Sequence, residues 1–327
     1  MPHLPFLHVG SWVCFLAFST HPSPNRIRGC YTALMRFFLV FLLYAFPACA
    51  QTELQQEIHR IATDAHGKVS VACSLPHSTF NCDLDPHARP PMQSVFKLPL
   101  AITALHIVEQ DRFPLDQPVH FFLGDRILPY SYSPLQDKYP EADVDVPLQE
   151  LLRLSTSLSD NVAADIVLHL VGGPSAVNSY IASLGVTGFH MQDYEHTLQR
   201  DPTAQYRNWF EPSGAVQLLR LISDQSPLTP QHTQLLLKWM QETPHGSRQI
   251  KGDLPPRTVV MHKTGSSGLV GDMTPATNDI GLITLPGGRR LAVAIFVTDS
   301  TADDAARNSV IARIAKAAYD EALLTKD

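Results

Sequence analysis

A serine and a lysine lie three residues apart, at Ser94 and Lys97, in the otherwise apolar stretch "PMQSVFKLPLA". On a helix, residues with this spacing share one face, so the lysine amine can reach the serine hydroxyl. The apolar neighbours remove water from the amine and favour its uncharged form, which can act as a base. Taken alone, the motif is better explained by a surface lysine on an amphipathic helix, because S-x-x-K arises by chance in most chains.

Two more short motifs follow, "SDN" at residues 159–161 and "KTG" at residues 263–265. The first stands between two predicted helices, where serine and asparagine usually cap the helix or turn the chain. The second falls in a predicted strand, where it could be a polar edge, although a strand glycine also lets a ligand approach the backbone closely. Each motif is weak by itself, but the three in this order indicate one functional site.

The elements that must position these motifs differ between the ends and the middle of the chain. A helix over residues 52–66 has a threonine cap and apolar residues at helical spacing, and residues 68–74 alternate like a strand. Residues 79–84 could pair with that strand. Near the C-terminus, three strand-like runs and a final amphipathic helix are predicted at residues 258–265, 278–286, 290–298 and 302–324.

The middle of the chain is predicted to be helical. A long apolar helix over residues 94–110 is followed by a loop with short elements over residues 111–147. Five further helices are expected at residues 148–155, 162–172, 173–185, 211–223 and 229–242. Residues 186–210 have no periodicity, and long irregular loops in compact domains are usually functional.

This order predicts an α+β fold with one antiparallel sheet built from both termini, flanked by helices, and an inserted all-helical lobe. The sheet lobe is expected at about residues 51–90 and 245–327, and the helical lobe at about residues 91–244. The 327 residues, 44% of them hydrophobic, are enough for a sizeable core.

The first 50 residues read as a leader that ends before the folded part. A start at Met35 would give a basic Arg36, an apolar run over residues 37–46 and an A-x-A cleavage pattern at residues 48–50, ahead of Gln51. The apolar run is too short to span a bilayer. Export to the periplasm is therefore expected, with a cytosolic chain that buries its N-terminal helix, or a lipidated cysteine at position 49, as the alternatives.

Charge and cysteine content agree with an exported enzyme rather than a nucleic-acid-binding protein. The net charge is −6, and without the three arginines of the leader the chain has 22 basic and 31 acidic residues. An acidic chain with no basic stripe repels phosphates. Beyond the leader only Cys73 and Cys82 remain, on either side of "SLPHSTFN". They are expected to form a disulfide, with two free packed thiols as the alternative.

Together, the three motifs resemble those of the serine β-lactamases and penicillin-binding proteins. The resemblance covers essentially all of residues 51–327. Within this superfamily it points to class A, whose Ω-loop carries an E-x-x-L-N motif. The irregular loop has "EHTLQ", which puts Glu195 at the acid position and Gln199 in place of the usual asparagine.

Finer residues resemble the PER/VEB-like branch of class A, many members of which hydrolyse oxyimino-cephalosporins. Gln93 precedes the serine, and Asp165 follows the S-D-N motif by about one helical turn. In many members an arginine clamps the Ω-loop by an ion pair, but Asp193 stands there, so the clamp is expected to be absent or rebuilt. Gln249 stands where many relatives bind the substrate carboxylate with arginine, and Arg248 is one residue away.

The resemblance implies roles for individual residues. The implied catalytic residues are Ser94, Lys97, Ser159 and Glu195. The implied substrate-binding residues are Tyr132, Asn161, Lys263, Thr264, Gly265 and Ser266. Ser94 would form an acyl-enzyme, and Glu195 would activate the water that releases it, with Gln199 positioning that water. Either Lys97 or Glu195 would be the base for acylation, and the backbone N–H groups of Ser94 and Ser266 would stabilise the oxyanion.

The expected partners are β-lactam antibiotics, bound by a monomer without nucleic acid or a stable membrane anchor. No cofactor and no metal are expected, because the 15 histidines include no H-E-x-x-H motif and no set with metal-ligand spacing. A D,D-peptidase of the penicillin-binding protein type is the first alternative, although such enzymes generally lack the deacylating glutamate. A non-catalytic β-lactam sensor is the second, and a degenerate motif would have supported it.

Overall fold

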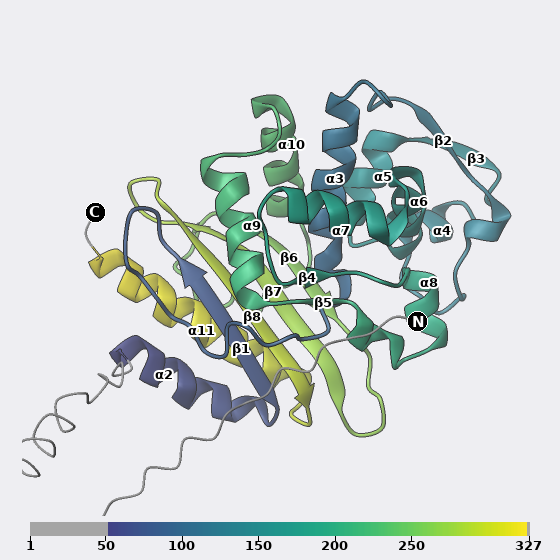
Figure 1. Ribbon diagram of the computed structural model, residues 1–327. Helices are drawn as coiled ribbons and strands as arrows, with labels where there is room; N and C mark the ends of the chain where they lie inside the picture. Colours follow the sequence, from purple (N-terminus) through teal and green to yellow (C-terminus); the bar gives the residue numbers. More distant parts are fainter. Residues whose placement is uncertain (1–51, 326–327) are drawn as a thin grey trace, which may run out of the picture. The chain divides into compact units, whose positions relative to one another are not determined.

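Strands from both ends of the chain form one antiparallel sheet, in the order β1-β8-β7-β6 (Figure 1). The computed structural model describes residues 52–325. The strands of the sheet are β1 Lys68–Ser74, β6 Val260–Ser266, β7 Thr274–Thr284 and β8 Arg290–Ser300. The α+β fold that the sequence predicts is therefore confirmed.

Both faces of this sheet are buried, which explains its nearly continuous apolar strands. On β8, Val293 and Ile295 pack with helix α2, Glu53–Ala62, and helix α11, Asp304–Leu324. The alternate residue Phe296 belongs to the second core on the opposite face. This alternation follows from the two-residue side-chain period of a strand.

The second face is covered by α9, Pro212–Asp224, which packs on β1, β7 and β8 (Figure 1). The next helix, α10, Pro230–Gln241, packs on β6. Both helices fall in the range that the sequence assigns to the helical lobe, yet they contact the sheet directly. The second of them, α10, also contacts α3 and α5 and so joins the sheet to the helices beside the S-x-x-K and S-D-N motifs.

The remaining helices pack around α3, Lys97–Glu109, which is buried on nearly all sides. The longer ones are α5 Leu148–Ser157, α6 Asn161–Val171 and α7 Gly173–Ser183. The shorter elements are η1 Thr63–Ala65, η2 Gln93–Phe96, β2 Pro118–Phe121, η3 Leu123–Asp125, α4 Pro134–Lys138, β3 Val144–Pro147, β4 Phe189–His190, α8 Glu195–Arg200, η4 Ala204–Arg207 and β5 Trp209–Phe210. The predicted irregular loop thus contains a short helix that begins at Glu195.

Two details near β1 bear on the sequence predictions. Residues 79–84 form no strand, and their backbone pairs with β1 at an isolated bridge between Val71 and Leu84. The predicted disulfide is present, and it joins Cys73 to Cys82 across a Cα–Cα distance of 5.6 Å. The predicted leader and its cleavage site lie outside the described residues.

Candidate active site

Ser94 lies in the short helix η2, where the chain enters α3, and lines a cleft of about 480 Å³. We call this the Ser94 cleft; its lining includes Ser94, Tyr132, Ser159, Asn161, His245, Thr264, Gly265 and Ser266. Gln93, just before the serine, has a φ of 47° and donates from its side chain to Gln205 of the irregular loop at 2.6 Å. Strained backbone of this kind is common where a side chain must be held in one orientation.

Lys97 lies fully buried beneath the Ser94 cleft and contacts four of the predicted site residues. Its Nζ lies 2.8 Å from Ser94 Oγ, 2.5 Å from Asn161 Oδ1 and 2.9 Å from Ser159 O. The Glu195 carboxylate oxygen Oε1 lies 2.9 Å away on another side. An ammonium group has three protons, but here it faces four acceptors. The amine is thus placed to pass a proton between the Ser94 hydroxyl and Glu195.

Lys263 contributes a second buried amine on the opposite side of the S-D-N motif. Its Nζ donates to Ser159 Oγ at 2.9 Å and to Thr264 O at 3.0 Å. Burial lowers the pKa of Lys263 and the charge of Lys97 adds to this shift, whereas Asp279 and Glu195 oppose it; the resulting pKa is about 7. The Lys263 amine can therefore change its charge near neutral pH.

Asp160, the middle residue of the S-D-N motif, fixes the two residues on either side of it. Its buried carboxylate accepts from Ala163 N at 2.9 Å, which caps α6, and from Leu135 N at 2.6 Å. Burial raises the pKa of Asp160, although these hydrogen bonds oppose the shift. Ser159 itself has a φ of 61°. The cap thus holds Ser159 in a left-handed conformation that places its hydroxyl in the cleft.

Gly265 allows β6 to lie directly against η2. A Cβ at this position would be 2.5 Å from Met92 O and 3.1 Å from Val95 N. Asn278, on the neighbouring strand, donates to Pro91 O at 2.9 Å and holds the same contact. The K-T-G glycine is therefore required by the packing of the chain itself, which brings the end of β6 beside Ser94.

Glu195 is held at the first turn of α8 by a carboxylate from α6. Asp165 accepts from the backbone N of Glu195 at 2.8 Å and of His196 at 2.9 Å. These two bonds satisfy donors that the start of a helix leaves unpaired. The Glu195 side chain is only 5% exposed and faces Lys97.

The irregular loop is clamped by an ion pair between Asp193 and Arg207, whose polarity is the reverse of the arginine clamp that the resemblance implies. Asp193 accepts from Arg207 Nε at 2.7 Å and from its Nη2 at 3.0 Å. Asn208 adds bonds from its amide, donating to Asp193 O at 2.9 Å and accepting from the N–H groups of Gln192 and Asp193. The expected clamp has been rebuilt rather than lost, and the sequence did not identify Arg207 as its partner.

Of two further predicted contacts, Tyr132 lines the Ser94 cleft, whereas Gln199 lines a separate cavity beside Asp165 and His196. The ring of Tyr132 is 48% exposed and meets His245 edge-on, with 5.6 Å between ring centroids. His245 also lies 3.0 Å from Leu158 O, and burial lowers its pKa. Gln199 accepts from Ser131 at 2.6 Å, while its buried Nε2 has no partner among the described protein atoms. Its predicted role in positioning water stays a prediction.

Three polar side chains stand near the place of the displaced arginine. Arg248 is largely exposed and donates to Asp304 at 3.0 Å, and Gln249 is buried and donates to Asn308 at 3.0 Å. Arg307, only 8% exposed, donates from Nε to Thr277, which lines the Ser94 cleft. The sequence did not single out Arg307, because its link to the cleft depends on the packing of α11 on β7.

A serine with a buried lysine, a second serine–lysine pair and a buried glutamate, all set between a sheet and a helical lobe, define a serine hydrolase that forms acyl-enzymes. The model of the β-lactamase enzyme family matches residues 53–322. The chain therefore belongs to this family, and within it to the class A serine β-lactamases.

Individual relatives support this assignment. The extended-spectrum β-lactamase PER-1 of Pseudomonas aeruginosa is 39% identical over 84% of this chain and 89% of its own length. VEB-1 from the same species is 31% identical over 87% of this chain and 97% of its length. Crystal structures of a β-lactamase from Chitinophaga pinensis and of the extended-spectrum enzyme TLA-1 both superpose with a TM-score of 0.80. They are 39% and 35% identical, and each covers 83% of this chain and 98% or more of its own.

Proposed function

We propose that Ser94 opens the β-lactam ring and that Glu195 completes its hydrolysis. In the first step, the Ser94 oxygen attacks the lactam carbonyl carbon, and the hydroxyl proton passes to a base. The carbon–nitrogen bond then breaks, and Ser159 gives a proton to the leaving nitrogen. In the second step, Glu195 takes a proton from water, which attacks the ester and releases Ser94.

The observation that carries this proposal is the buried contact of Lys97 with both Ser94 and Glu195. Nζ lies 2.8 Å from the serine oxygen and 2.9 Å from the carboxylate. Both Lys97 and Glu195, the latter acting through a water, remain candidates for the acylation base. The direct contact of Lys97 with Ser94 supports Lys97 as the acylation base. Its contact with Glu195 supports proton transfer between Lys97 and Glu195 from one step to the next.

The remaining residues bind the substrate. The backbone N–H groups of Ser94 and Ser266 stabilise the oxyanion, and removing such a donor typically costs about 10²–10³ in turnover. The side chains that hold the substrate carboxylate are Lys263, Thr264 and Ser266, with Gly265 between them. Asn161 binds the amide side chain of the substrate, Tyr132 forms an aromatic wall, and Gln199 positions the deacylating water.

Penicillins and cephalosporins are the proposed substrates, and their hydrolysis in the periplasm would confer antibiotic resistance. Extended-spectrum substrates are included because PER-1 and TLA-1, both named extended-spectrum enzymes, are 35–39% identical to this chain. Among residues 52–325, no helix is long and apolar enough to cross a membrane. We propose that the chain acts as a monomer.

The proposal is tested by intact mass after mixing the protein with a cephalosporin. Glu195→Ala should still be acylated, and its adduct should persist because no base activates the second-step water. The parent should carry only a transient adduct, and Ser94→Ala none. Asp201→Ala is the comparison variant from the same loop: its partly exposed carboxylate lies 3.7 Å from Arg207, so its loss should affect the adduct far less than the loss of Glu195.

Other outcomes would favour the alternatives. If Glu195→Ala turned over substrate like the parent while Asp201→Ala accumulated the adduct, the assignment of Glu195 as the deacylating base would be wrong. If the parent itself kept a stable adduct and did not turn over nitrocefin, the protein would act as a D,D-peptidase of the penicillin-binding protein type or as a sensor. D,D-peptidase activity on a D-Ala-D-Ala peptide would then distinguish those two.

A further inference from the structure

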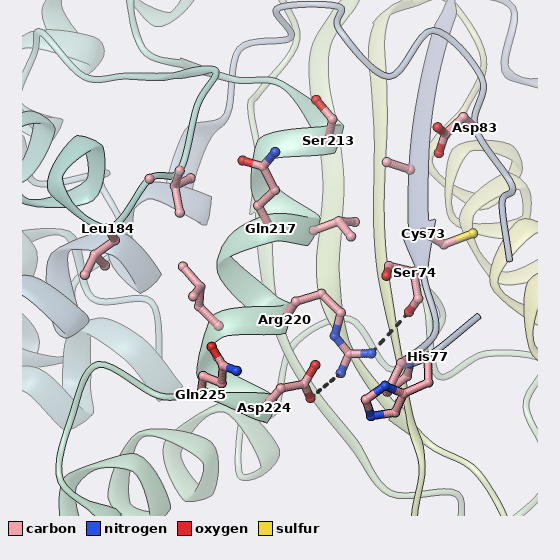
Figure 2. A pocket seen from close by; sticks show the side chains of 16 residues that line it. Cys73, Ser74, His77, Asp83, Leu184, Ser213, Gln217, Arg220, Asp224 and Gln225 are labelled. Carbon is pink, nitrogen blue, oxygen red and sulfur yellow. Dashed lines mark hydrogen bonds and ion pairs between the residues drawn. The ribbon is translucent and has the colours of Figure 1, made fainter. Parts of the chain in front are cut away.

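A second cleft, of about 940 Å³, lies between α9, β1 and the turn after α7 (Figure 2). It shares no lining residue with the Ser94 cleft. Its walls are largely apolar and include Leu184, Val186, Val216 and Leu221. We call it the Arg220 cleft, because the Arg220 side chain extends across it from α9 towards β1 (Figure 2). Its volume and apolar lining are typical of sites for small organic molecules.

The Arg220 guanidinium is largely buried and is only partly satisfied by the protein. Nη1 donates to Arg290 O at 2.7 Å and to Ser74 O at 3.3 Å, and Nη2 donates to Asp224 Oδ1 at 3.1 Å. The Nε–H, by contrast, is buried without an acceptor among the described protein atoms. Buried donors are nearly always paired, so the unpaired Nε–H leaves a guanidinium that would gain from a further acceptor.

The charge around Arg220 is also incompletely balanced. Burial lowers the pKa of Arg220, and the nearby charge of Arg290 adds to this, although Asp224 opposes it. The Asp224 side chain is 40% exposed, so water weakens its attraction for the guanidinium. Asp83 lines the same cleft, but burial raises its pKa. The buried cation thus has one solvated carboxylate as its only hydrogen-bonded anion within residues 52–325.

We propose that the Arg220 cleft is a second ligand site, which binds a small organic carboxylate with an apolar body. A small rotation of the Arg220 side chain turns its Nε–H into the cleft, where the ligand carboxylate accepts it, and the apolar body packs between α9 and the turn after α7. Guanidinium groups suit this role because their fork of donors matches a carboxylate in shape and charge. An apolar ligand body also removes the apolar walls of the cleft from water, which stabilises the complex. An inorganic anion has no apolar surface and lacks this contribution.

The test is a calorimetric titration of the purified protein with 4-phenylbutyrate. The neutral 4-phenylbutanamide is titrated for comparison. The acid should bind, and the amide should bind at least about tenfold more weakly, because a charge-assisted hydrogen bond is lost. Arg220→Gln should weaken binding of the acid by a similar factor. In NMR spectra of the parent protein, the Arg220 Nε–H resonance should shift as the acid is added. This readout does not depend on the folding of any variant.

Asp224→Asn should strengthen binding of the acid, whereas Arg220→Gln should weaken it, and this opposite change discriminates better than a loss of binding. Asp224→Asn removes the competing carboxylate but keeps the side-chain shape, so the acid should bind about threefold or more tightly. Asp320→Asn is the matched control, because it breaks a similar i,i+4 pair with Lys316 on α11, and should change nothing.

Three results would overturn the proposal. The first is equal binding of the acid and the amide. The second is binding that neither Arg220→Gln nor Asp224→Asn alters. The third is purely competitive inhibition of nitrocefin hydrolysis by 4-phenylbutyrate with no shift of the Arg220 signal, which would place the ligand in the Ser94 cleft. Binding of inorganic phosphate as tight as that of the acid would also contradict an organic ligand.

Discussion

At the scale of single residues, the proposed role of Lys263 predicts that substrate binding depends on pH. Its pKa of about 7 means that the amine is cationic below this pH and neutral above it. A substrate carboxylate needs the cation, so cephalosporin affinity should fall as pH rises, in the limit by about tenfold per unit. Dissociation constants measured on Ser94→Ala from pH 6 to pH 9 avoid interference from turnover.

Lys263→Arg is the companion variant for this prediction. Arginine stays charged throughout the range, so the fall in affinity above pH 7 should flatten. A pH-independent affinity in the Ser94→Ala background would contradict the prediction, since it would mean that Lys263 stays charged. Identical slopes with lysine and arginine would show that another group controls the titration.

The residues that could be predicted from sequence are those whose partners lie nearby in the chain or in a recognised motif. Ser94 and Lys97 meet because they are three residues apart on one turn. Arg207 and Arg307 were not assigned their contacts, because each acts through a partner fixed only by tertiary packing, and the same holds for the bond from Leu135 N to Asp160. In the sequence each of these residues is a single acid or arginine, and such residues also occur at many surface positions that have no special role.

At the scale of elements, the Ω-loop depends on the reversed ion pair between Asp193 and Arg207. Asp193→Asn should loosen the loop and misplace Glu195, and misplacement of about 1 Å can cost up to roughly 10²-fold in rate. The variant should mainly lower the rate of deacylation, and intact mass spectrometry should detect a longer-lived acyl-enzyme. The double exchange Asp193→Arg with Arg207→Asp should recover part of this loss.

A control separates this effect from a general loss of charge pairs. Glu57→Gln breaks an exposed pair with Arg60 on α2, far along the chain from the loop, and should leave deacylation unchanged. If Asp193→Asn also left it unchanged, Asn208 and its three hydrogen bonds would suffice to hold the loop.

Most elements could be predicted because their periodicity is strong and their ends are marked. The helix at 52–66 was expected from its threonine cap, and α2 begins at Glu53 with Thr52 accepting from Gln55 N. Residues 79–84 were a weaker case: the run resembles a strand, but its backbone pairs with β1 only at the single bridge between Leu84 and Val71. The short helix α8 could not be found by periodicity, because it has only six residues and depends on Asp165 for its first turn.

At the scale of the whole molecule, export makes a prediction about the N-terminus. If the leader is cleaved at the A-x-A pattern, the protein recovered from the periplasm should begin at or near Gln51. N-terminal sequencing or intact mass measures this directly. A periplasmic protein that retains residues 1–34 would contradict the proposed start at Met35.

The disulfide gives a second prediction at this scale, and it depends on the same compartment. Cys73 and Cys82 are nine residues apart, and closing such a loop stabilises a protein by roughly 2–3 kcal/mol if it acts on the unfolded chain. The double variant Cys73→Ser with Cys82→Ser should lose about this much free energy of unfolding, measured by urea denaturation. Reductant should destabilise the parent by the same amount and leave the double variant unchanged. A parent insensitive to reductant, with two titratable thiols after denaturation, would mean that the cysteines are unpaired in the exported protein.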